Sequence, residues 1–153
     1  MHQDKLSFLS TLFVPLLNNL QADAVGKWGK MSGQQMVEHV AGFFRVSAGK
    51  IVFPLVTPVE HLPKFKEFLY SEKEFRENTK APMLPEDPLP VRFATMQKAV
   101  ADLDAAVKGF INKFSTDEHL LVMHPVFGDL NFEEWILLHY KHVTHHLKQF
   151  GLA

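Results

Sequence analysis

The chain has 153 residues, a formal net charge of −1, 46% hydrophobic residues and no cysteine. A length of this order suits one ordinary domain, so we expect a single domain over residues 1–153, and the balanced charge offers nothing to attract nucleic acid or an anionic membrane. The lack of cysteine excludes disulfides, thiolate metal ligands and cysteine nucleophiles, so any metal must be held by nitrogen and oxygen.

The N-terminal segment has apolar residues at helical spacing, which predicts a first helix from about Asp4 to Leu20. Pro15 should kink it, because its missing N–H cannot bond one turn back. The segment also resembles a weak signal peptide that ends in small residues at 22–24. However, the negative charge of Asp4 offsets the positive charge of Lys5, and polar residues interrupt the apolar run. We therefore interpret it as a structural helix of a cytoplasmic protein, and no apolar run is long enough to span a membrane.

A polar loop, "QADAVGKWGKMS", precedes the second predicted helix. Ser32 and Gln35 have the spacing of a capping box, in which each side chain bonds the other's backbone N–H, so this helix should begin there and end near Gly49. Its apolar stripe is formed by Met36, Val40, Phe43 and Val46. His39 lies on the same face as these residues, which are expected in the core.

Residues 51–90 contain seven of the nine prolines and should form an extended excursion. Each proline removes a donor and pushes its predecessor out of the helical region. Only "KFKEFLYSEKEF" is expected to form a short helix. An excursion of this length is usually functional or packed over the body of the domain.

The strongest periodicity predicts a third helix, with apolar residues that step by three and four at Phe93, Met96, Val100, Leu103, Val107, Phe110 and Phe114. Asn131 and Glu134 form a second capping box and begin a fourth helix that runs to about Phe150 and stops at Gly151. No convincing strand alternation is present. We expect an all-α four-helix bundle with the proline-rich excursion between helices two and three.

The fourth helix carries a ridge of histidines, in which His139, His142 and His146 fall within roughly 60° of one another. His145 points about 100° away from His146. His142 and His146 have the four-residue separation at which side chains on adjacent turns can chelate one ion, and His39 can join them from the second helix. Three imidazoles leave coordination positions for water or substrate. The alternative is that these are ordinary core or surface histidines.

Two segments, "WGKMSGQQMVEHV" and "HPVFGDLNFEEWILLHYKHVTHHLKQFG", resemble the DinB-like superfamily of metal-binding four-helix bundles, in particular an uncharacterised bacterial branch. The resemblance covers most of the chain and is weakest between residues 51 and 90. It implies a divalent metal on His39, His142 and His146, with Gln149 in the position of the superfamily's glutamine. Some members transfer low-molecular-weight thiols to electrophiles, and others are described as metal-dependent hydrolases.

Three more residues are candidates for supporting roles. His139 is an outer partner or extra ligand of the metal, or else a core histidine. His124, in "MHPVFGDL", reaches the mouth of the site, or else the segment is a shaped turn in which Val126 and Phe127 plug the end of the bundle. The third candidate for a supporting role is Gln149, three residues after His146.

The resulting hypothesis is a metal-dependent hydrolase or thiol transferase acting on a small molecule, in which zinc or nickel, or else manganese or iron, activates water or a thiol. The alternatives are a non-catalytic metal- or ligand-binding stress-response module and a structural bundle whose histidines set its pH stability. A homodimer is compatible with the sequence, since related bundles pair, but no stripe identifies an interface.

Overall fold

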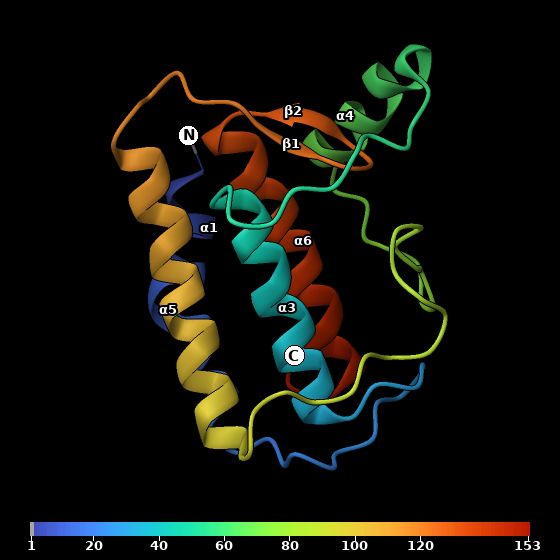
Figure 1. Ribbon diagram of the computed structural model, residues 1–153, viewed down its shortest axis with the longest axis vertical. Coiled ribbons are helices and arrows are strands. Elements are labelled where there is room, and N and C mark those ends of the chain that lie inside the picture. The colour runs from blue at the N-terminus through green and yellow to red at the C-terminus, as the bar shows by residue number, and fades with distance from the viewer. Residues whose placement is uncertain (1) are drawn as a thin grey trace.

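A computed structural model describes residues 2–153 and shows a mostly helical domain with one small sheet (Figure 1). The helices are α1 Gln3–Ser7, the π-helical η1 Phe8–Leu12, α2 Phe13–Leu16, α3 Gly33–Ser47, the 3-10 helix η2 Val59–His61, α4 Leu62–Tyr70, α5 Met96–Ser115 and α6 Phe132–Gln149. The strands are β1 Val122–His124 and β2 Gly128–Leu130. None of the helices in residues 2–153 combines the length and apolar character needed to cross a bilayer.

The three long helices α3, α5 and α6 run side by side, with the hairpin of β1 and β2 across one end and α4 beyond it (Figure 1). α3 packs along α5 and also contacts α6, while the N-terminal helical segment contacts both α5 and α6. The predicted stripes of the second and third helices supply the core between them, where Met36, Val40, Leu103, Val107 and Phe110 are almost completely buried.

The N-terminal segment departs from the single kinked helix expected from Asp4 to Leu20. It ends at Leu16, and a π-helical stretch at Phe8–Leu12 replaces the kink. Because Pro15 has no N–H, regular bonding cannot continue through it, and the chain widens one turn earlier. Leu17 and Leu20 follow in turns but are still buried in the core.

The expectation of an exclusively helical chain is wrong at residues 122–130, where β1 and β2 pair antiparallel with Val122 opposite Leu130 and His124 opposite Gly128. Gly128 has φ +79, a left-handed conformation that glycine adopts without strain. Strands of three residues are too short to show an alternating pattern in the sequence. The predicted plug is partly confirmed, since Phe127 is buried.

The helix ends agree closely with the capping signals. Ser32 and Gln35 form the capping box that begins α3, and Asn131 and Glu134 form the one that begins α6. Gly151 follows α6 in the left-handed conformation, with φ +72. The short helix expected within "KFKEFLYSEKEF" is α4, which starts two residues earlier and ends at Tyr70.

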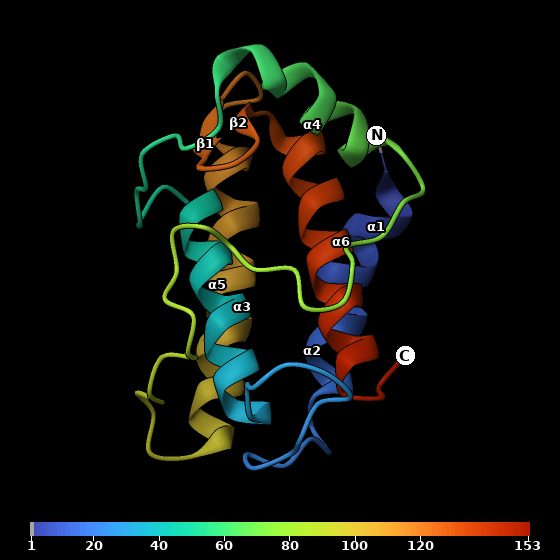
Figure 2. The same ribbon diagram turned by 90° about the vertical axis from the view of Figure 1, so that its right-hand side faces the viewer.

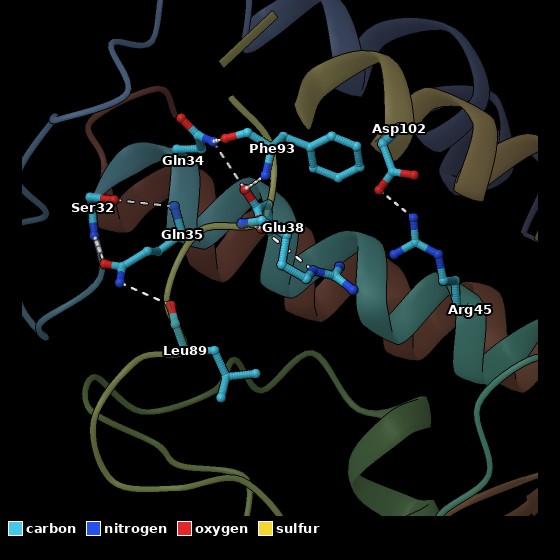
Figure 3. A network of polar contacts seen from close by, with 9 residues as sticks. Ser32, Gln34, Gln35, Glu38, Arg45, Leu89, Phe93 and Asp102 are labelled. Carbon is cyan, nitrogen blue, oxygen red and sulfur yellow. Dashed lines mark hydrogen bonds and ion pairs between the residues drawn. The ribbon is translucent and has the colours of Figure 1, made fainter. Parts of the chain in front are cut away.

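Residues 71–93, called the strap below, cross α3 and α6 on one face of the domain (Figure 2). At the α6 side, the Lys141 ammonium donates to the carbonyl of Ser71, 2.8 Å away, and Lys148 pairs with Glu74. At the α3 side, the side chain of Gln35 donates to the Leu89 carbonyl over 3.0 Å (Figure 3). The strap is therefore tied to both helices.

The buried carboxylate of Glu38 forms the firmest tie of the strap (Figure 3). It accepts hydrogen bonds from the backbone N–H groups of Arg92, at 2.8 Å, and Phe93, at 3.3 Å. Gln34 donates both to Glu38, over 3.0 Å, and to the Phe93 carbonyl, over 2.8 Å. Glu38 is therefore a structural residue, because a buried carboxylate needs such donors.

Candidate metal centre

Three histidine side chains from two helices meet between α3 and α6. His39 comes from the middle of α3, and His142 and His146 come from successive turns of α6. One potential ligand atom of each lies within 4.8 Å of the others. His146 is buried, whereas His39 and His142 are half-buried, so the cluster is not sealed from solvent.

The same type of nitrogen converges from each ring. His142 Nε2 lies 3.0 Å from His39 Nε2 and 3.0 Å from His146 Nε2. A zinc–nitrogen bond is about 2.1 Å long, so nitrogens at these separations can share one ion. The three-histidine group could hold a metal ion.

The environment keeps the rings neutral, which is the form that binds a cation. Burial lowers the pKa of His39 to about 4, and the nearby His145 lowers it further. Burial also lowers the pKa of His142 and His146 well below the ordinary value, with an additional contribution from the neighbouring imidazoles. Near neutral pH none of the three therefore carries the second ring proton, whose positive charge would repel a metal.

Gln149 determines which nitrogen of His146 faces the cluster. The amide nitrogen of Gln149 donates to the Trp28 carbonyl over 2.9 Å, so its Oε1 is left to accept from His146 Nδ1–H, 2.7 Å away. A neutral imidazole has one N–H, and with Nδ1 protonated the Nε2 of His146 presents a lone pair to the cluster.

This tautomer leaves the cluster unsatisfied by hydrogen bonding alone. If His142 Nε2 carries a proton, that single N–H has two acceptors and can aim well at only one of them. If His39 donates to His142 instead, the lone pairs of His142 and His146 face each other at 3.0 Å. A cation among the three nitrogens would satisfy every lone pair, so the residues fit a metal.

Two glycines allow the loop before α3 to close around Gln149. A Cβ at Gly26 would lie 2.9 Å from Gln149 Cγ, and one at Gly29 would lie 2.9 Å from Gln149 Nε2. Gly29 also has φ +77. The glycines on either side of Trp28 are the only signal in the sequence for this contact, and sequence reasoning did not connect them with Gln149.

His139 lies one turn before His142 but belongs to the core. Its Nε2 is 2.8 Å from Ser47 Oγ, and its ring stacks on Phe44 with centroids 3.8 Å apart. It is 1% exposed and is not part of the three-nitrogen group. Of the roles considered for it, the structure places it as a core histidine.

His124 ends β1 and shapes the hairpin. Its Nδ1 accepts from the N–H groups of Val126, at 3.0 Å, and Phe127, at 3.3 Å. The ring of Phe43 stacks against His124 at 6.0 Å and also touches the rings of His39 and His142. Phe43 thus stands between His124 and the cluster, and His124 does not join the three nitrogens.

The fold and the cluster together define a mostly helical domain with a three-histidine group that could hold a metal. Residues 71–152 match the family described as "Protein of unknown function (DUF1569)". The match covers more than half of the chain, which therefore belongs to this family. It includes His142, His146 and Gln149, whereas His39 lies outside it. No curated protein and no solved structure matches the chain.

Proposed function

We propose that this protein is a metal-dependent enzyme of the DinB-like type, with a divalent cation on the Nε2 atoms of His39, His142 and His146. The observation that carries the proposal is the convergence of these nitrogens, with those of His39 and His146 each 3.0 Å from His142 Nε2, where a single N–H cannot satisfy all three. The four-helix bundle of that superfamily corresponds to the N-terminal helical segment, α3, α5 and α6, with the proline-rich excursion between α3 and α5.

The donor set indicates the class of chemistry. Among residues 2–153 the three-nitrogen group contains no carboxylate, and we assign the activation of the nucleophile to the metal. A divalent cation with open positions supplies that activation by lowering the pKa of a bound water or thiol. Hydrolysis and thiol transfer to an electrophile are the two reactions that this activation serves.

The role of the protein's own residues is to hold and orient. Gln149 keeps the proton of His146 on Nδ1, and Phe43 packs against two of the three rings. Lys141, the neighbour of His142, and Lys148, two residues after His146, bind the strap to α6. Glu38, the neighbour of His39, binds it to α3. We propose that the strap borders the substrate. Imidazole ligands suit Zn²⁺ and Ni²⁺, and also Mn²⁺ or Fe²⁺.

The test is metal content followed by activity. Protein purified without a nickel column should carry one equivalent of metal per chain, measured by inductively coupled plasma mass spectrometry, and His142→Ala should carry less than about a tenth of that. The matched control is His145→Ala on the same helix, whose ring is outside the three-nitrogen group, and it should keep its metal. Wild type and His142→Ala without bound metal would refute the proposal.

Activity then separates the enzyme from a non-catalytic metal-binding module. The metal-loaded protein is offered an electrophile with a small thiol, or simple esters and amides, and product is followed by chromatography. Turnover by the wild type that is lost in His142→Ala supports the enzyme. A fully loaded protein without turnover of any of these substrates supports the binding module instead.

A further inference from the structure

A cavity of about 410 Å³ lies between α6, the loop before α3 and the strap. Small-molecule sites commonly have volumes of about 300–1,000 Å³. None of the three cluster histidines lines this cavity, which is therefore separate from the candidate metal centre. The two share a boundary, because Trp28 lines the cavity while its carbonyl holds Gln149.

Three aromatic rings from three different segments form one part of the wall. The ring of His145 lies 5.4 Å from that of Trp28 and 6.0 Å from that of Phe75, centroid to centroid. All three side chains are half-buried. Aromatic faces of this kind stack favourably on the ring of a ligand.

The rim of the cavity carries charges of both signs. Lys148 and Glu74 pair with each other across it, which joins α6 to the strap. Lys27 and Glu77 also line it, and neither forms an ion pair with any residue of the range 2–153. One ammonium and one carboxylate are therefore left to meet opposite charges on a ligand.

We propose that this cavity binds a small zwitterion with a ring, of the chemistry of an aromatic α-amino acid. The ring lies against Trp28 and Phe75, the ligand's carboxylate faces Lys27, and its ammonium faces Glu77. A ligand with only one of the two charges leaves the other rim residue without a partner. This site does not depend on the metal, so it extends the proposed function rather than resting on it.

Three probes with the same ring test the proposal. L-Phenylalanine has both charges, 3-phenylpropionate has only the carboxylate, and phenethylamine has only the ammonium. Titrations use isothermal calorimetry and tryptophan fluorescence, on the protein as purified and after treatment with a chelator. We expect L-phenylalanine to bind at least about five-fold more tightly than either singly charged probe, as exposed ion pairs allow.

Two variants of the cavity rim test which residue faces each charge of the ligand. Lys27→Gln should weaken binding of L-phenylalanine about five-fold and leave phenethylamine unchanged, while Glu77→Gln should weaken L-phenylalanine and leave 3-phenylpropionate unchanged. Both positions are exposed, so the fold should tolerate the changes. Lys64→Gln, an exposed lysine outside the cavity, is the matched control and should bind as the wild type does. The fluorescence change should disappear in Trp28→Phe, because Trp135 is 0% exposed in the core.

Equal affinity for the three probes, or no saturable binding up to about 10 mM, overturns the proposal. So does an unchanged preference in both rim variants. Because the chelator-treated protein should still bind L-phenylalanine, failure of the metal centre and failure of this site give different results. A protein that has lost its metal and still binds L-phenylalanine supports the cavity site.

Discussion

Two neighbouring places on α6 use histidine in different ways. At His139 the imidazole has a hydroxyl partner, Ser47, and aromatic rings around it. One turn later, the nitrogens of His142 face other imidazole nitrogens at 3.0 Å. Both places are on one ridge of the same helix, so the residue type and its spacing do not distinguish them.

The difference teaches that the partner element decides the role of a buried histidine. α3 offers Ser47 opposite His139. The Ser47 hydroxyl donates to the Phe44 carbonyl over 2.9 Å, so its oxygen is left to accept from His139 Nε2–H, 2.8 Å away. The same helix offers His39 opposite His142, and with His146 as a second neighbour no single N–H can satisfy all three nitrogens. The His139 nitrogen has its partner within the protein, whereas the three-histidine group could hold a metal ion.

The largest expected difference between the two places is the response to metal removal. At a free metal concentration about 100 times the Kd, binding stabilises the native state by about 2.7 kcal/mol. A chelator should therefore lower the melting temperature of the wild type by about 5–10 °C. His39→Ala should melt at the lower temperature already and respond to the chelator hardly at all, as measured by differential scanning fluorimetry.

A second prediction concerns the buried pair of His139 and Ser47. Ser47→Ala leaves a polar nitrogen of His139 without a partner in the core, which should lower the free energy of unfolding by about 2 kcal/mol in urea denaturation. The double variant Ser47→Ala with His139→Phe removes both polar groups and should recover most of this loss. Metal content should stay at the wild-type level in both variants, and a drop would show that the two places are coupled.

The third prediction extends the comparison to His124, whose ring is surrounded by Phe43, Phe127 and Trp135. Burial lowers the pKa of His124 to about 3, so between about pH 3 and 6.5 the unfolded chain takes up the proton more readily than the folded one. The contribution of this group to the free energy of unfolding is fully present above pH 6.5 and decreases as the pH falls toward 3. At pH 5 the decrease is about 2 kcal/mol.

His124→Asn isolates this contribution, because the amide oxygen can accept from the same two N–H groups without titrating. Urea unfolding of chelator-treated protein at pH 7 and pH 5 should show a loss of stability about 2 kcal/mol smaller for the variant than for the wild type. An identical pH dependence for the two proteins would falsify the assignment to His124.

The smallest expected effect is at Gln149, which touches the cluster only through His146. Gln149→Ala removes the acceptor that keeps the proton of His146 on Nδ1. Metal binding should then weaken about ten-fold, measured by competition with a chromophoric chelator. His146 remains in place, so the metal stoichiometry at saturation should not change. Gly29→Ala acts on the same contact, because its Cβ would crowd the Gln149 amide, and should weaken binding in the same direction.

Local signals predicted the helices well because capping boxes and apolar stripes act over three or four residues. The starts of α3 and α6 and the stop at Gly151 follow from such signals. The π-helical stretch before Pro15 and the three-residue strands were not predicted. The π-helical stretch follows from the missing N–H of Pro15, whose effect on the preceding turn the spacing of apolar residues does not reveal. The strands form through pairing with each other, which outweighs a weak local preference.

The amino-acid sequence by itself determined that His142 and His146 lie on one face of a helix and that His39 lies on the inward face of another, since helical geometry is local. Only the tertiary structure decided that these three nitrogens meet while His139 meets Ser47. It alone brought the loop around Trp28 to Gln149 and buried Glu38 beneath the strap. Such contacts join residues far apart in the chain, and their partners depend on how the helices pack against one another, which no local spacing encodes.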